Sequence, residues 1–252
     1  MEKIAFISDI HSNCFALQAV LEDIEQQDIK QIINLGDSLY GAISPRQTFE
    51  LLNQPHILHI SGNQNRQIYQ STVQDVQRNT TLQFILNDLN QDAIDWLKKL
   101  SFDLRLQQEI YCCHATPKND EIYLLEDVSS GLPKVRTEKE ILKLLNGEQA
   151  KFIIHGHSHI HRTVQLSTGQ YIINAGSVGY PAYFDNMPYY HQIENFSPMA
   201  NYVVLEIFQN IWKIRHHQVS YDWQAAAKKA KQNGRDDWAY NLTTGRVKSD
   251  ME

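Results

Sequence analysis

Seven side chains that could bind metal ions occur in five short segments, in a fixed order along the chain. The segments are Asp9-Ile10-His11, Gly36-Asp37, Gly62-Asn63, His114 and Gly156-His157-Ser158-His159. They supply three oxygen ligands and four imidazoles, a mixed set that suits divalent transition metals. Seven ligands are too many for one tetrahedral ion and fit two ions that share a ligand. The pattern therefore predicts the binuclear metal site of a hydrolase.

Each of these residues has an ordinary structural explanation when it is taken alone. An aspartate after a strand is usually a turn or capping residue, and a lone histidine such as His114 is more often a hydrogen-bonded core residue. The cluster His155, His157 and His159 is different, because packing does not explain three imidazoles within five residues. The joint arrangement carries the metal interpretation.

The elements that must position the ligands are short apolar runs, each of which ends just before a ligand. We expect strands at residues 3–8, 31–35, 56–60 and 151–155 and a hairpin at 104–113, with helices from about residue 14 (capped by Ser12 or Asn13) and at 45–52. This alternation indicates parallel strands with right-handed crossovers. In such sheets ligands gather at the carboxyl ends of the strands.

The rest of the chain completes one expected domain, residues 1–252. We expect a helical flank at about 66–100, a helix at 137–145, short strands at 163–166 and 171–174, a hairpin of 201–208 with 211–219, a helix at 223–231 and a loosely ordered tail beyond Gly234. The expected fold class is α/β, a four-layer α-β-β-α sandwich with the metal site at the carboxyl ends of strands.

Composition excludes several classes of protein. A net charge of −6 argues against binding of a nucleic-acid polymer, which needs a basic face. No apolar run is long enough to span a membrane, and the amino terminus lacks a signal-peptide pattern. Cys14, Cys112 and Cys113 do not form a disulfide framework, so we expect reduced thiols and a cytoplasmic protein of unknown oligomeric state.

The ordered motifs resemble those of the calcineurin-like metallophosphoesterase family: Asp-x-His, Gly-Asp, Gly-Asn, His and Gly-His-x-His. His114-Ala115-Thr116-Pro117 and Asn174-Ala175-Gly176-Ser177-Val178-Gly179 are further similarities, and the resemblance covers about residues 1–208. Gly36-Asp37-x-x-Tyr40-Gly41 with Ser44-Pro45 looks nearest to the small bacterial branch of phosphodiesterases and diadenosine-tetraphosphatase-like proteins.

The resemblance implies which residues hold each ion. One metal would be bound by Asp9, His11 and His159, the other by Asn63, His114 and His157, with Asp37 bridging the two; Asp37, Asn63 and His114 also count as catalytic. A hydroxide shared by the ions would attack phosphorus in line. Ligand types alone allow manganese, iron, zinc, cobalt or nickel.

The informative departure from the family is Gln64. Many members have a histidine after the metal-binding asparagine, proposed to protonate the leaving group, whereas this chain reads Gly62-Asn63-Gln64-Asn65. Glutamine has no proton to release near neutral pH. The loss matters least when the leaving group is already a stable anion, which favours a phosphoanhydride or activated phosphodiester, such as a dinucleoside polyphosphate.

Other residues are candidates for contact with a small phosphorylated substrate, which could be a nucleotide. Gln64, Arg66 and His161 are the candidate substrate contacts, and Arg162 is a further arginine near a metal motif. His191, Tyr190 or His161 could replace the missing proton donor. The aromatic run 180–184 with Tyr189 and Tyr190 either stacks on a base or covers a strand edge.

The sequence thus predicts a metal-dependent phosphoesterase and leaves two rivals open. One is a phosphodiesterase for cyclic nucleotides or other diesters at the same metals. The other is a nucleotide-binding regulatory protein with weak turnover, which the Gln64 departure permits.

Overall fold

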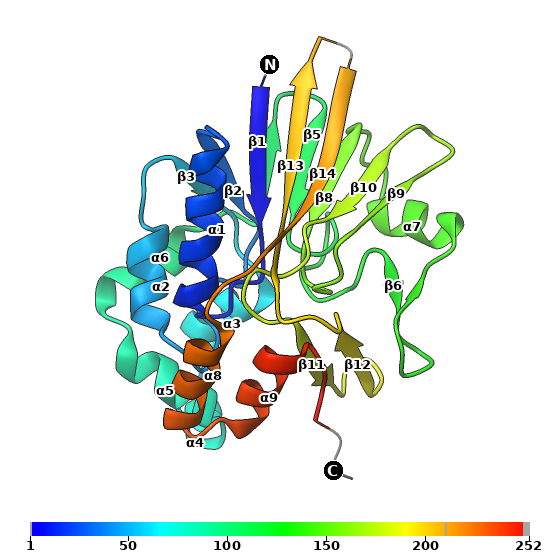
Figure 1. The fold of residues 1–252 in the computed structure, drawn as a ribbon. Coiled ribbons are helices and arrows are strands. Elements are labelled where there is room, and N and C mark those ends of the chain that lie inside the picture. The colour runs from blue at the N-terminus through cyan, green and yellow to red at the C-terminus, as the bar shows by residue number, and fades with distance from the viewer. Residues whose placement is uncertain (1, 210, 249–252) are drawn as a thin grey trace.

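Two five-stranded β-sheets packed face to face form the centre of the molecule (Figure 1). The computed structural model describes residues 2–209 and 211–248. The first sheet has the order β14-β13-β1-β2-β3, with bounds Ile211–Val219, Ala200–Phe208, Glu2–Ile7, Gln31–Asn34 and Ile57–His59. The second has the order β4-β5-β8-β10-β9, with bounds Asp103–Leu106, Ile110–Cys113, Phe152–His155, Tyr171–Asn174 and Arg162–Gln165.

The strands that end at the predicted ligands are parallel, as their unbroken apolar runs indicate. In the first sheet β1 pairs in parallel with β2, and Phe6 lies opposite Ile33; β2 pairs in parallel with β3. In the second sheet β5, β8 and β10 are parallel, and β4 and β9 join the two edges in antiparallel fashion. The carboxyl ends of both sets of parallel strands therefore point to one site.

The core between the sheets holds these ends in place. Apolar side chains of both inner faces fill it, among them Phe6, Ile33, Ile110, Phe152 and Ile154. All five side chains are almost completely buried, and their removal from water is the main stabilising contribution to this interface.

Helices cover the outer faces of the two sheets, so the layers are the expected α-β-β-α (Figure 1). The apolar cluster on the outer face of the first sheet includes residues of α1 (Cys14–Gln26), α2 (Pro45–Leu52), α3 (Asn63–Gln70), α5 (Thr80–Asp88), α6 (Gln91–Lys99), α8 (Trp223–Gln232) and α9 (Asp236–Thr244). The short helix α4 (Val73–Arg78) has no buried residue and lies against α5, and α7 (Glu138–Leu145) covers the second sheet. The Asn13 side chain caps α1 by accepting from the Ala16 amide.

The expectation of a loose tail beyond Gly234 is wrong for residues 236–244, which form α9. Trp238, Ala239 and Leu242 of this helix are buried in the same apolar cluster as α1, and this packing orders the segment. Residues 249–252 lie outside the described part.

Two small hairpins were also not predicted: β6 (Glu126–Asp127) with β7 (Lys134–Val135), and β11 (Ala182–Asp185) with β12 (His191–Glu194). The second hairpin contains part of the aromatic run. Among the described residues, no helix has both the length and the apolar character that a membrane crossing requires.

Candidate functional site

All seven predicted ligands lie in loops or at a helix start directly after parallel strands, and the structure brings them to one site. Asp9 and His11 follow β1, Asp37 follows β2, Asn63 begins α3 after β3, His114 follows β5, and His157 and His159 follow β8. Five of them have a left-handed backbone: φ is 53° at Asp9, 50° at His11, 49° at Asp37, 68° at His157 and 60° at His159. Such angles are uncommon outside glycine and cluster at functional sites.

The first group of ligands is Asp9, His11 and His159. The Nε2 atoms of the two histidines are 3.0 Å apart, and Oδ1 of Asp9 lies 3.3 Å from Nε2 of His159 and 3.8 Å from that of His11. All three residues are buried.

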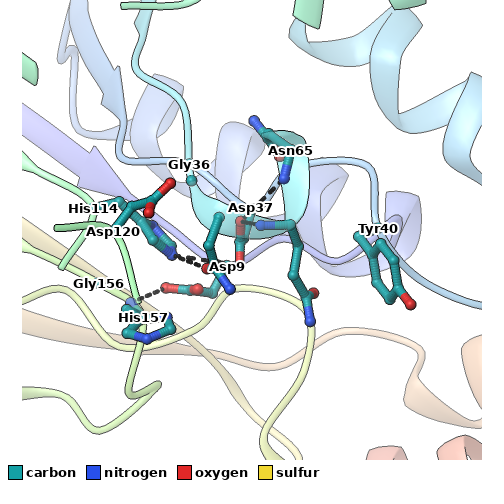
Figure 2. A network of polar contacts seen from close by, with 12 residues as sticks. Asp9, Gly36, Asp37, Tyr40, Asn65, His114, Asp120, Gly156 and His157 are labelled. Carbon is teal, nitrogen blue, oxygen red and sulfur yellow. Dashed lines mark hydrogen bonds and ion pairs between the residues drawn. The ribbon is translucent and has the colours of Figure 1, made fainter. Parts of the chain in front are cut away.

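The second group is Asp37, His114 and His157. Oδ2 of Asp37 lies 3.4 Å from Nε2 of His114, and the side-chain oxygen of Asn63 lies 3.1 Å from the same nitrogen. The two groups adjoin, because Oδ2 of Asp9 accepts a hydrogen bond from the His157 amide (2.9 Å). Figure 2 shows Asp9, Asp37, His114 and His157 converging on one point.

Backbone carbonyl groups fix which nitrogen of each imidazole can bind a metal. The Nδ1–H group of His11 donates to the carbonyl oxygen of Tyr40 (2.9 Å). In the same way His114 donates to Leu35 (2.9 Å), and His159 donates to Tyr180 (2.6 Å). Nε2 of His157 instead donates to the carbonyl oxygen of Glu121 (3.0 Å). Nε2 of three of the histidines and Nδ1 of His157 are therefore the atoms that would bind a metal, since metal-binding histidines donate their other N–H to an acceptor.

The donor set itself fits a bound cation. With both Nδ1 protons donated to carbonyl groups, His11 and His159 direct two Nε2 lone pairs at each other across 3.0 Å. Oδ1 of Asp9 is buried beside them and has no hydrogen-bond partner within the described residues. Acceptors without a donor are costly in a buried site. A divalent ion would satisfy all three atoms.

Two glycines leave the space that the carboxylates occupy. A Cβ atom at Gly62 would lie 2.2 Å from Oδ1 of Asp37, and one at Gly156 would lie 2.4 Å from Oδ2 of Asp9. Real Cβ atoms do not approach other atoms so closely, so any larger residue would displace the ligand.

The first turn of α3 orients the Asp37 carboxylate. Its Oδ1 accepts from the amides of Gln64 (2.9 Å) and Asn65 (3.4 Å), as Figure 2 shows for Asn65. Helix N-termini favour negative charge, so this contact stabilises the ionised carboxylate. Its other oxygen, Oδ2, is left facing His114.

Burial and charge act in opposite directions on the ionisable groups of the site. Burial alone would lower the pKa of His114, but the Asp37 carboxylate and the more distant Asp9 raise it to about 9. Burial lowers the pKa of His157 to about 4 and also lowers that of His159. The pKa of Asp9 is well below its usual value, because attraction to His159 and its neighbours outweighs burial. The pKa of Asp37 is also lowered, because burial raises it less than attraction to His114 and its other neighbours lowers it. Both carboxylates are therefore ionised at neutral pH and need positive charge nearby.

The family described as "Calcineurin-like phosphoesterase superfamily domain" matches residues 2–192. This chain belongs to that family. It is therefore a metal-dependent phosphoesterase, a hydrolase of phosphoester bonds. Its two buried Asp/His clusters are consistent with the binuclear divalent-metal site typical of this family.

Relatives of this metallophosphoesterase align with nearly the whole length of the chain. The uncharacterized protein MJ0912 of Methanocaldococcus jannaschii is 28% identical over 258 residues, covering 93% of this chain and 94% of the relative. A metallophosphoesterase from Sphaerobacter thermophilus has a TM-score of 0.74 at 19% identity, covering 97% of this chain and 99% of its own. The hypothetical protein PH1004 from Pyrococcus horikoshii has a TM-score of 0.77 at 16% identity, covering 98% and 100%. These two structures share the fold.

Two cavities of the metallophosphoesterase meet at the metal ligands. The smaller, about 290 Å³, contains His11 and His159 in its wall and is closed by Arg235, Asp237 and Trp238 around α9. The larger, about 940 Å³, extends over α3 and α4. The residues common to both walls are Tyr40, Asn63, Gln64, Asn79, Tyr123, His157 and Asp185.

The three candidate substrate contacts lie in different surroundings. Gln64 lines both cavities, and its Oε1 is buried without a partner among the described residues. Arg66 lines the larger cavity, but Asp120 and Glu121 already accept its Nε and Nη2 hydrogen bonds. His161 lines neither cavity, and its ring lies beside His216 with centroids 5.9 Å apart.

Of the remaining candidates, His191, Tyr190 and Arg162 line neither cavity. His191 is buried behind Tyr123, whose hydroxyl it contacts at 3.0 Å, and exposed Tyr190 lines neither cavity. Arg162 lies 3.5 Å from the buried carboxylate of Glu126. From the aromatic run, Tyr180, Tyr183 and Phe184 line the smaller cavity.

Sequence reasoning missed several residues of the walls: Arg78, Tyr123, Arg136, Arg235 and Trp238. The aromatic ring of Tyr123 packs on the His157 imidazole with centroids 4.6 Å apart, and Trp238 stacks on Tyr180 at 3.8 Å. None of these residues belongs to a motif with fixed spacing. The acidic pair Asp236-Asp237, followed by the apolar residues of α9, was the one available signal for the C-terminal wall.

Proposed function

We propose that this metallophosphoesterase hydrolyses a phosphoanhydride or an activated phosphodiester, with a dinucleoside polyphosphate as the representative substrate. The observation that carries the proposal is the position of Gln64 at the junction of two cavities that share the metal ligands. The proposal places the chain in the phosphodiesterase and diadenosine-tetraphosphatase-like branch of the family.

The proposed metal assignment follows the two groups of ligands. Asp9, His11 and His159 would hold one ion, and Asn63, His114 and His157 the other, with Asp37 shared. Two divalent ions bound there would neutralise phosphoryl oxygens and lower the pKa of a coordinated water molecule. The ligand types suit manganese, iron, zinc, cobalt or nickel. Asp37, Asn63 and His114 would position these groups around the phosphorus.

Cavity shape favours a phosphorus atom with substituents on two sides. A phosphomonoester carries one organic group and would fill one cavity, whereas a diester or an anhydride carries a group on each side. The larger cavity is within the size range of small-molecule sites, and the smaller is close to its lower end. Aromatic residues Tyr180, Tyr183 and Phe184 in the smaller wall would contact an apolar or nucleobase substituent.

Leaving-group chemistry favours the same substrates. Gln64 can accept or donate a hydrogen bond at the reacting group but cannot supply a proton. Its Oε1 is buried and has no partner in the part of the chain that the structure describes, so it can accept a hydrogen bond from the substrate or water. A leaving group that departs as a stable anion, such as a nucleotide, needs no proton donor.

A substrate panel tests the proposal. Purified protein with its metal content measured would be assayed with diadenosine tetraphosphate, bis(p-nitrophenyl) phosphate, 3′,5′-cyclic AMP and glycerol phosphate, with chelator controls. We expect turnover of the first two to exceed that of glycerol phosphate by at least about 10²-fold, the lower bound for a missing general acid. Equal rates on glycerol phosphate would refute the proposal, and preferred cleavage of cyclic AMP would support the cyclic-nucleotide rival. Tight nucleotide binding without hydrolysis under any metal would support the regulatory rival.

A further inference from the structure

The wall of the larger cavity contains exposed Arg78 and half-buried Arg136, whose terminal nitrogens have no partner within the described residues. Arg136 donates from Nε to the carbonyl oxygen of Tyr123 (3.1 Å), and its Nη1 and Nη2 make no hydrogen bond or ion pair with any residue of 2–209 or 211–248. Arg78, the last residue of α4, has no such partner for its guanidinium within the same residues. Arg66 differs from them, because its guanidinium forms ion pairs with the carboxylates of Asp120 and Glu121.

Four acidic residues near these arginines accept hydrogen bonds from other groups. Asp75 accepts hydrogen bonds from the amide and hydroxyl of Thr72 at the start of α4, and Asp185 accepts from the Met187 amide. Around Arg136, Asp127 accepts from Ser129 and Glu140 accepts from Thr137. The buried carboxylate of Glu126 lies 3.5 Å from Arg162 and is also attracted to Arg136, and Asp75 is attracted to Arg78. Neither carboxylate makes a hydrogen bond or close ion pair with Arg78 or Arg136 within the described residues, so both arginines keep terminal N–H groups to donate.

Arg136 is also connected to the metal centre through one residue. Its Nε holds the backbone of Tyr123, whose ring packs on the ligand His157. Arg78 is adjacent to Asn79, which donates to the Tyr40 hydroxyl (2.9 Å), and both Asn79 and Tyr40 line the two cavities. The unpaired guanidinium groups therefore belong to the same cavity that reaches the metal ligands.

We propose that Arg78 and Arg136 form a second anion subsite, which binds a phosphate group attached through a bridging oxygen to the phosphorus that reacts. Guanidinium N–H groups bind phosphate oxygens through charge-assisted hydrogen bonds. The cavity also has an apolar portion, formed by Leu82, Ile122, Val128, Met187 and Pro188, which would contact the organic part beyond that phosphate. The subsite rests on the proposed function and narrows it to polyphosphate substrates.

The test compares two substrates in matched variants. Arg78→Gln, Arg136→Gln and the double variant would be assayed with diadenosine tetraphosphate, which has further phosphates, and with bis(p-nitrophenyl) phosphate, which has one. Arg46→Gln is the control, because Arg46 is paired with Glu50 on the exposed side of α2 and lines neither cavity. We expect kcat/KM for the polyphosphate to fall roughly 10- to 100-fold per arginine, mainly through KM, as for loss of a hydrogen bond to a charged group. The rate on the single-phosphate substrate should stay within about twofold of wild type, since it makes no contact there.

A binding measurement separates this subsite from the metal chemistry. Inorganic tripolyphosphate would be titrated into the metal-free protein by calorimetry. We expect tripolyphosphate to bind wild type and Arg46→Gln, and to bind the double variant at least about tenfold more weakly. Arg136→Lys keeps the positive charge, so it should bind tripolyphosphate more tightly than Arg136→Gln does. Equal loss on both substrates, or unchanged binding of tripolyphosphate, would overturn the subsite. If no substrate is hydrolysed, the proposed function fails, and the titration alone decides whether the anion subsite exists.

Discussion

Replacing Gln64 by histidine would give this enzyme the proton donor that the common motif contains. Gln64 lies in the first turn of α3, and its side chain lines both cavities where they meet at the metal ligands. Its backbone amide, which donates to Asp37, is retained in the variant. The change therefore adds an imidazole at the junction without removing a metal ligand.

The expected gain is smaller than the full value of a general acid. A positioned acid contributes roughly 10²- to 10⁴-fold for a poor leaving group. In this chain the next residue is Asn65, whose side chain is buried and accepts from the Ser38 amide (2.7 Å), so no carboxylate follows to orient the new imidazole. We expect Gln64→His to raise kcat/KM for alkyl esters about 10- to 100-fold and to change that for p-nitrophenyl esters by less than about threefold.

The assay is a series of phosphodiesters with leaving groups from p-nitrophenol to simple alcohols. The dependence of log kcat/KM on leaving-group pKa should be steep for wild type and shallower for Gln64→His, with metal content checked in both. Gln67→His, one turn further along α3 in the larger cavity only, is the matched control. A shallow dependence already present in wild type would refute the reasoning, because another group would then supply the proton.

Four further outcomes are expected. Gly62→Ala should reduce bound metal at least about tenfold, because the added Cβ would lie 2.2 Å from Oδ1 of Asp37. Gly147→Ala is the control and should keep its metal, because nothing lies within 4 Å of a Cβ added there. Elemental analysis compares the metal content of the two variants. Metal affinity should rise about tenfold per pH unit up to about pH 9, since the proton held by His114 must leave before the ion binds. Competition with a chelator at several pH values measures the affinity. An affinity that does not change with pH would contradict the raised pKa of His114. The same raised pKa stabilises the metal-free protein below about pH 6.5, and this contribution should be lost as the pH rises through 9. Trp238→Ala should lower the free energy of unfolding by about 3 to 5 kcal/mol in urea titrations, as for other buried aromatics, and a loss under 1 kcal/mol would show that α9 adds little to the core.

The sequence predicted that the candidate ligands would lie close together, because their signal is local, and their binding of metal stays a prediction. Asp9, His114 and His157 each follow an apolar run that can only be a buried strand, and parallel strands must bring their ends together. The layer order followed from the same alternation of strands and helices. The bridging role of Asp37 stays a prediction, since both its oxygens are placed but no ion is.

The cavity walls could not be predicted in the same way. Arg78 ends a short helix and Arg136 follows a two-residue strand, so neither has a spacing that relates it to a ligand. Their position depends on how α4 and the β6–β7 hairpin pack over the site, which is a property of tertiary structure. The prediction of a loose tail was wrong although its signal is local. The buried residues of α9 have helical spacing, but the polar residues between them concealed it.

The left-handed backbone at Asp9, His11, Asp37, His157 and His159 bears on whether the metal site is still in use. Each such residue costs about 1 kcal/mol or more relative to an ordinary backbone, and glycine would remove much of that cost. A lineage that no longer needed the ions would gain stability from substitutions at any of the five positions, and drift would remove the ligands one by one. This chain has all five candidate ligands at that cost, as expected of a site that still binds the ions of a metal-dependent phosphoesterase.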